Sequence, residues 1–165
     1  MQRRTFLKAG LLGGLALAAG GAVYRQFRPP VAERFALDAQ GRTMLAALVP
    51  AITGVTPQPA ALNAGIDRVA GAIASLPLRV QKEISDLFGL LTMAPTRRLL
   101  AGVPAWEEAA PAEVAAFLQS WRTHRTEMLQ TAYHGLHDLV IGAWYADPST
   151  WAAVGYPGPM KELSA

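Results

Sequence analysis

Apolar residues recur at helical spacing along most of the chain, beginning after Asp38. Asp38 is suited to cap a first helical turn, because its carboxylate can accept from the free amides there. Pro50 is expected to bend or end this first helix. The apolar face is formed by four positions at i, i+3, i+4 and i+7, namely Leu45, Leu48, Val49 and Ile52.

Three further segments keep the same spacing. One helix is expected over 62–76, another begins at Pro77, and a third begins at Pro111; proline is favoured in a first turn because the amide it lacks would be unpaired there. Their apolar faces are formed by three sets of residues: Leu62, Ile66, Val69, Ala70 and Ile73; Val80, Ile84, Leu87, Phe88 and Leu91; and Val114, Phe117, Leu118 and Trp121.

A long last helix is expected over 126–145. Its main apolar stripe consists of Leu129, Tyr133, Leu136, Val140 and Trp144. A second apolar line runs beside it through Ile141 and Tyr145. A helix that is apolar on two sides is either deeply buried or covered by another protein, and the pattern leaves both open.

The rest of the pattern contains no convincing strand alternation or hairpin turn. Residues 92–104 are expected to form a short Arg97–Leu100 turn followed by a loop. The sequence therefore predicts an all-α fold, a compact single-domain bundle of about five helices with an extended, proline-rich C-terminal tail.

The amino-terminal part differs from this domain. Residues 9–23 carry no charge, but about 15 residues are fewer than the ~20 that comfortably span a bilayer. A cationic start before a short apolar run is typical of a secretion signal. The stretch Arg3-Arg4-Thr5-Phe6-Leu7-Lys8 resembles the twin-arginine export signal at all its defining positions, which are Arg3, Arg4, Phe6, Leu7 and Lys8. The expected division is a signal over 1–22, either cleaved or retained as an anchor, a linker over 23–37 and a helical domain over 38–165.

Charge and composition narrow the functional classes. The chain has 15 Lys and Arg against 12 Asp and Glu, and three of the cations lie in the leader, which leaves the remainder neutral. No basic cluster with interleaved aromatic residues appears there, so nucleic-acid binding is not expected. The chain has no cysteine, which excludes a thiolate-bound iron–sulfur cluster and a covalent c-type haem in this chain.

Few residues suggest chemistry of their own. The sequence has neither a phosphate-binding glycine loop after a strand nor a nucleophile elbow. His134 and His137 share a helix face and Asp138 lies near it, so the three could bind a divalent metal. The spacing is weak evidence without a third ligand, and polar histidines on a partly exposed helix are the simpler explanation, so we expect no metal or cofactor in this chain.

The C-terminal stretch is the most specific part of the domain. Asp147 can cap a short turn that begins at Pro148, and Gly155 can end it. Gly158 precedes a proline and is expected to be extended. Aromatic residues are favoured interface anchors, so the predicted partner-binding residues are those gathered here: Trp144, Tyr145, Trp151, Tyr156, Pro157, Gly158 and Pro159.

With its leader and its helical body, the ending Trp151…Gly155-Tyr156-Pro157-Gly158-Pro159 resembles the gluconate 2-dehydrogenase subunit 3 family. The resemblance covers residues 37–159, and only the last stretch is motif-like. It implies a small, non-catalytic accessory subunit in the periplasm, associated with the membrane only through its leader. The implied partners are a large FAD-dependent dehydrogenase of the glucose–methanol–choline type, in many members also a cytochrome c subunit, and the twin-arginine translocase that exports the assembly.

Two alternatives remain open at this point. The chain could be an independent periplasmic enzyme that binds a metal or ligand through His134, His137 and Asp138. It could also be a scaffold anchored in the membrane by a retained leader. The sequence does not indicate which sugar or sugar acid the expected complex oxidises.

Overall fold

A computed structural model describes residues 34–158, and every regular element in this range is helical. Six α-helices are followed by one 3₁₀-helix, against the five helices expected. Their bounds are α2 Ala39–Thr53, α3 Pro59–Ala74, α4 Leu78–Thr92, α5 Ala94–Ala101, α6 Pro111–Arg122, α7 Glu127–Tyr145 and η1 Pro148–Val154. The all-α prediction is confirmed. Within 34–158, no helix combines the length and hydropathy that crossing a membrane requires.

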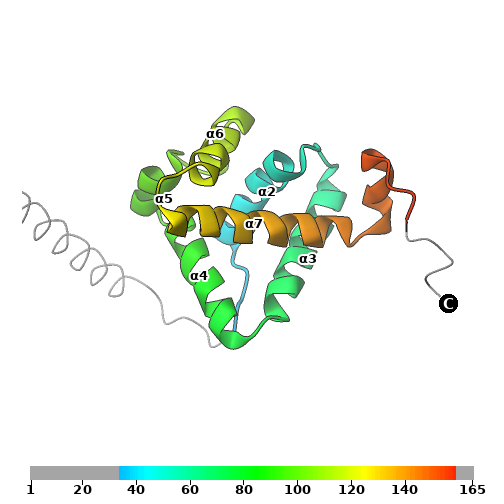
Figure 1. Ribbon diagram of the computed structural model, residues 1–165, viewed down its shortest axis with the longest axis horizontal. Coiled ribbons are helices and arrows are strands. Elements are labelled where there is room, and N and C mark those ends of the chain that lie inside the picture. The colour runs from blue at the N-terminus through cyan, green and yellow to red at the C-terminus, as the bar shows by residue number, and fades with distance from the viewer. Residues whose placement is uncertain (1–33, 159–165) are drawn as a thin grey trace, which may run out of the picture. The chain divides into compact units, whose positions relative to one another are not determined.

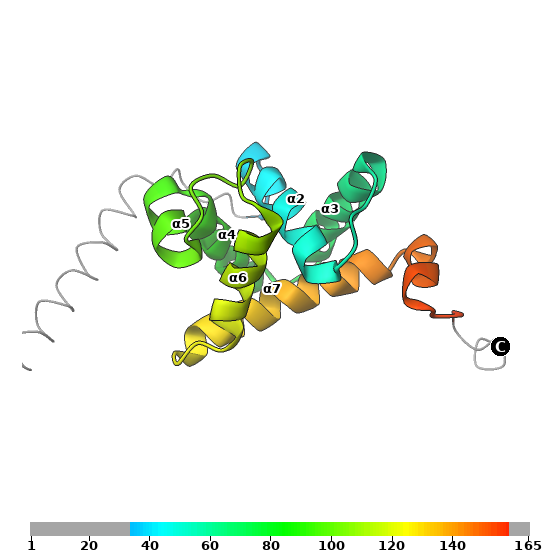
Figure 2. The same ribbon diagram turned by 90° about the horizontal axis from the view of Figure 1, so that it is seen from above.

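Helix α2 lies at the centre of the bundle, in contact with α3, α4, α6 and α7. Helix α7 crosses α2, α3 and α6 as one long rod (Figure 1). Seen from above, α3 and α6 stand on either side of α2, and η1 projects beyond the end of α7 (Figure 2). The C-terminal element is therefore attached to one helix, whereas the others share a common core.

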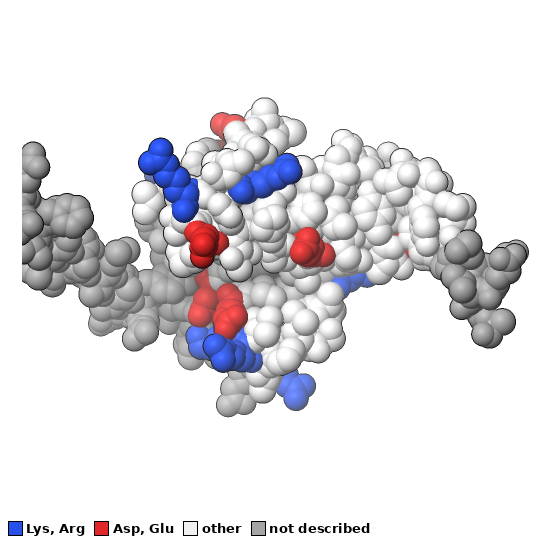
Figure 3. All heavy atoms as spheres, viewed as in Figure 1, with Lys and Arg blue, Asp and Glu red and all other residues white. Residues whose placement is uncertain are grey.

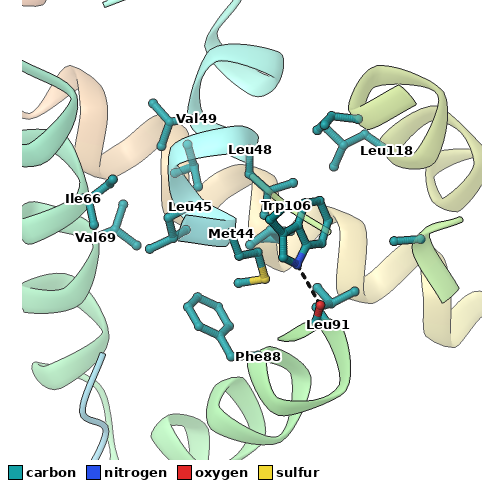
Figure 4. Packing of buried hydrophobic residues seen from close by; sticks show 14 of the residues in the cluster. Met44, Leu45, Leu48, Val49, Ile66, Val69, Phe88, Leu91, Trp106 and Leu118 are labelled. Carbon is teal, nitrogen blue, oxygen red and sulfur yellow. Dashed lines mark hydrogen bonds between the residues drawn. The ribbon is translucent and has the colours of Figure 1, made fainter. Parts of the chain in front are cut away.

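The core is built from the apolar faces that the sequence pattern predicts (Figure 4). Three side chains of α2, namely Met44, Leu45 and Leu48, have no exposed surface. The fully or nearly fully buried neighbours from the other helices include Ile66, Val69, Ile73, Leu91, Val114 and Val140. Asp38 caps α2 as expected, because its Oδ1 accepts from the Gly41 amide at 2.7 Å.

The segment between α4 and α6 differs from the expected turn and loop. Ala94–Ala101 forms a helix, α5, which ends at Gly102 with φ 71°. Trp106 follows in the loop, is 4% exposed, and donates from Nε1 to the Leu91 carbonyl at 2.8 Å (Figure 4). Helix α5 itself accepts a hydrogen bond from a distant residue, since Trp121 Nε1 donates to the Leu100 carbonyl at 3.0 Å, and a local pattern does not reveal such a contact.

Two boundaries also differ from expectation. Pro77 precedes α4 as its N-cap, with ψ 144°, and does not lie within the first turn. Helix α3 begins at Pro59, three residues earlier than expected. At the start of the domain, Phe35 belongs to the expected linker but packs on the core, its ring centroid 5.5 Å from that of Phe88 and its amide bonded to Gln81 Oε1 at 2.9 Å. Ordered packing therefore begins before residue 38.

Candidate functional site

Residues 147–158 form a small unit at the end of α7, here called the C-terminal cap. As the sequence predicts, Asp147 caps η1, with its Oδ1 accepting from the Ser149 amide at 2.9 Å. Gly155 ends η1 with φ 70°, a conformation that favours glycine. All residues of η1 are exposed or half-buried. The cap is therefore regular in structure although it adds no buried side chain to the core.

Several polar contacts hold the cap against the bundle. Arg68 on α3 donates from Nε to the Ala143 carbonyl and forms an ion pair through Nη1 with Asp147 Oδ2, both at 3.0 Å. The Ser149 amide and, to a smaller degree, Arg68 hold the pKa of Asp147 below its ordinary value. From the cap, Trp151 Nε1 donates to the carbonyl of Tyr145, the last residue of α7, at 2.7 Å. These contacts fix the direction in which the cap leaves α7.

An aromatic pair lies on the outer part of the cap. The rings of Trp151 and Tyr156 meet edge to face with centroids 5.2 Å apart, and the Tyr156 amide donates to the Trp151 carbonyl at 3.1 Å. Tyr156 is 49% exposed and Val154 is 54% exposed. Pro157 is also exposed. Together these residues present an apolar surface that is pre-arranged and open to solvent.

Gly158, the last described residue of the tail, lies against the ring of Trp151. Gly158 has φ 97°, and a Cβ there would lie 3.2 Å from Cζ3 of Trp151. Glycine adopts such a positive φ readily, and its missing side chain lets the backbone approach the indole ring. The extended backbone expected before Pro159 stays a prediction. Pro159, the last predicted anchor, lies outside the described residues.

The other two predicted anchors differ in exposure. Trp144 is 5% exposed and packs on α3, where its Cε3 and Cζ3 atoms lie 2.9 Å from the position a Cβ of Gly65 would take. Its indole ring therefore belongs to the core and is not available to a partner. Tyr145 is half-buried against the core and supplies the carbonyl that Trp151 binds. The structure thus joins Trp151 to the Tyr156 ring and to the Tyr145 carbonyl, whereas the ring of Trp144 is buried on α3.

The histidines of α7 lie on another part of the surface. His137 Nδ1 lies 3.1 Å from Asp138 Oδ1, and the side chain of Asp138 is 77% exposed. The ring of Tyr133 contacts both imidazoles, with its centroid 5.2 Å from that of His134 and 5.6 Å from that of His137. In the described part of the chain, no three His, Asp or Glu side chains are grouped closely enough to hold a metal ion. The local geometry is that of surface histidines packed on a tyrosine.

Sequence reasoning missed the residue that locks the cap in place. Arg68 is separated from Ala143 by 75 positions, and no periodicity connects positions so distant. The predicted export residues, Arg3, Arg4, Phe6, Leu7 and Lys8, lie outside the described residues.

Comparison with known proteins yields no match for this chain: no family model, no curated protein and no solved structure is significantly similar to it.

Proposed function

We propose that this protein is a non-catalytic accessory subunit of a periplasmic, FAD-dependent sugar or sugar-acid dehydrogenase, and that it docks on the catalytic subunit through its C-terminal cap. The resemblance of the leader and of the Gly155–Pro159 ending to the gluconate 2-dehydrogenase subunit 3 family supports this identity. The observation that carries the docking role is the solvent-exposed Trp151–Tyr156 pair, held in a fixed geometry outside the core.

A fixed aromatic surface favours binding for two reasons. Tryptophan and tyrosine contribute most often to the few residues that dominate interface energies. A surface that is already ordered loses less conformational freedom on association. The bond from Trp151 Nε1 to Tyr145 and the Arg68–Asp147 ion pair provide this order before any partner binds.

The proposed docking surface contains fewer of the predicted residues than the sequence alone suggests. It consists of Tyr145, Val154, Tyr156, Pro157 and the exposed part of Trp151, with Gly158 shaping the end. Trp144 is omitted because its ring is buried on Gly65. No catalytic residue is assigned to this chain, and the flavin is expected in the partner.

The proposal includes a role in export. A twin-arginine route carries folded proteins, so a subunit with such a leader can take a bound partner across the membrane with it. Replacing Arg3 and Arg4 by lysine keeps both charges but removes the planar guanidinium groups. We expect the double variant and its flavoprotein to stay in the cytoplasm, as measured by cell fractionation. Normal periplasmic yield of both chains would contradict the export role.

The docking role is tested by isolating the exported protein from the periplasm through an affinity tag. A large chain that carries FAD should co-purify in a fixed ratio, identified by its flavin absorbance and by mass spectrometry. Isolation of the protein alone, or with a partner that holds no flavin, would contradict the proposed function.

A further inference from the structure

A second feature of the surface is an apolar groove between α4 and α7. Its volume is about 510 Å³. Nearly all of its lining side chains are apolar, and they come from α4, from α7 and from the turn before α4: Leu76, Val80, Glu83, Ile84, Leu87, Phe88, Met128, Thr131, Ala132, Gly135, Leu136 and Leu139. The groove is separate from the C-terminal cap and does not depend on the proposed identity of the catalytic subunit.

The groove arises because both helices carry more apolar surface than the core covers. On α4, Phe88 and Leu91 are buried, whereas Ile84 and Leu87 are half-buried and line the groove. On α7, Leu136 is buried, whereas Met128 at the end of the groove is 71% exposed. Exposed apolar surface of this kind commonly marks an interaction site.

The shape of the groove suits a helix. Its lining on α7 runs from Met128 to Leu139, which corresponds to about 16 Å at the rise of an α-helix. The residues in the middle of this line are small: Thr131, Ala132 and Gly135. A Cβ at Gly135 would meet only open space among the described residues. Small residues let a second helix approach closely, and apolar anchors at i, i+3, i+4 and i+7 would fill the space.

The chemistry of the lining argues against a small polar ligand. Sites for such molecules combine an apolar wall with several convergent polar groups. Among the lining residues only Glu83 and Thr131 have polar side chains, which are few for a small polar ligand. The apolar face of a helix would need no polar partner in the groove.

The charges on α4 and α7 indicate which charge a bound helix should carry beside its apolar face. The sequence of α7 contains no lysine or arginine, and its carboxylates are Glu127 and Asp138. On α4, Arg79 pairs with Glu83 at 3.2 Å and Lys82 pairs with Asp86 at 3.0 Å. The two helices together therefore have a formal charge of −2, histidine being neutral. Figure 3 shows acidic side chains over both α4 and α7 on this face, with basic side chains beside them at the lower end of α4 and above the start of α7.

From these observations we infer that the groove binds an amphipathic helix of a partner protein, apolar on one face and flanked by Lys or Arg. Complementary charge would set its orientation and speed its association. The occupant is thus a basic amphipathic helix rather than a neutral or acidic one.

Three synthetic peptides test this inference on the full chain by titration calorimetry. The first places leucine at helical spacing with flanking lysine, the second replaces every lysine by glutamate, and the third scrambles the first. We expect saturable binding of one leucine–lysine peptide per chain. The other two peptides should bind at least about tenfold more weakly, a difference of about 1.4 kcal/mol in binding free energy. Equal affinity for the lysine and glutamate peptides would overturn the inference.

The chain offers a matched pair of variants on α7. Gly135→Leu fills the groove, whereas Gly142→Leu places the same side chain outside the lining, where the described residues leave open space. Both replace a poor helix former, so both should fold. Gly135→Leu should weaken the leucine–lysine peptide about tenfold or more, and Gly142→Leu should leave its affinity unchanged. Equal affinity of the two variants would contradict binding in the groove.

Other occupants give different outcomes. If the groove binds a second copy of this chain, sedimentation will show a dimer that Gly135→Leu dissociates. If the chain's own amino-terminal segment fills the groove, peptide binding will appear only after residues 1–33 are removed. Either result would overturn the inference of a partner helix.

Discussion

Trp144 and Trp151 lie seven positions apart at the end of the chain, yet their environments are opposite. Trp144 is 5% exposed and packs where Gly65 leaves room on α3. Trp151 is half-buried, binds the Tyr145 carbonyl and packs edge to face on Tyr156. The same residue type thus closes the core in one place and builds an exposed surface in the other.

The two tryptophans show that the end of α7 completes the core, whereas the C-terminal cap forms an exposed surface. The core requires close packing, so its residues tolerate little change of volume. The C-terminal cap requires fixed geometry at an exposed surface, which hydrogen bonds and one ion pair provide. Substitutions before Ala146 should therefore affect mainly the free energy of unfolding, and substitutions after it should affect mainly the affinity for the partner.

The largest difference is expected between Trp144→Ala and Trp151→Ala. Truncating a buried tryptophan leaves a cavity, so Trp144→Ala should lower the free energy of unfolding by about 3–5 kcal/mol. Trp151→Ala removes one hydrogen bond and one aromatic contact, at a cost of about 1–2 kcal/mol. Urea unfolding followed by circular dichroism measures both values. Equal losses would mean that the cap is as much a part of the folding unit as the core.

Two glycines of α3 test how tightly the core is packed around Trp144. A Cβ at Gly65 would lie 2.9 Å from the Trp144 ring, whereas a Cβ at Gly71 would lie in open space within the described structure. Gly65→Ala should therefore destabilise the protein by about 1–3 kcal/mol through overpacking. Gly71→Ala should stabilise it by about 0.5–1 kcal/mol, because alanine is the better helix former. A stabilising Gly65→Ala would show that Trp144 can move aside easily.

A smaller effect is expected from the charge that locks the cap. The pKa of Asp147 is lowered by the Ser149 amide and by Arg68, so the folded state favours the carboxylate. Its contribution to stability is present above the ordinary value of 3.8 and is lost as the pH falls below it. Asp147→Asn keeps an acceptor for Ser149 but has no charge. The Tm difference between wild type and variant should therefore exist at neutral pH and close in acid. A difference independent of pH would contradict the ionic role.

The sequence predicts the long helices well because their apolar positions recur over several turns. It fails for α5, where Leu99 is 83% exposed and Leu100 is half-buried, so that no clear apolar face marks the helix. The fixed position of α5 depends instead on distant donors, such as Trp121 Nε1 bonded to the Leu100 carbonyl at 3.0 Å. Trp106, a core residue, lies in a loop and leaves no periodic signal.

For the candidate site, the sequence predicts the position of the cap but not the orientation of its aromatic residues. The turn residues Asp147, Pro148 and Gly155 define η1 locally. Helical spacing places Trp144 in an apolar stripe, and only the contact with Gly65 shows how completely the core covers it. The groove between α4 and α7 is likewise not visible in the sequence, because periodicity does not show which apolar residues remain uncovered.

The central claim is that the exposed aromatic surface of the cap binds the flavoprotein subunit, and Tyr156→Ala tests it most directly. Leu99→Ala is the control, because Leu99 is also an exposed apolar residue but lies on α5. We expect Leu99→Ala to keep the wild-type Tm and Tyr156→Ala to lower it only slightly, because Tyr156→Ala loses the aromatic contact with Trp151 but leaves the core intact. Tyr156→Ala should weaken the complex about 30-fold, as for a hot spot of about 2 kcal/mol, and Leu99→Ala should not. Unchanged flavin content per tagged Tyr156→Ala chain, at normal stability, would contradict the account.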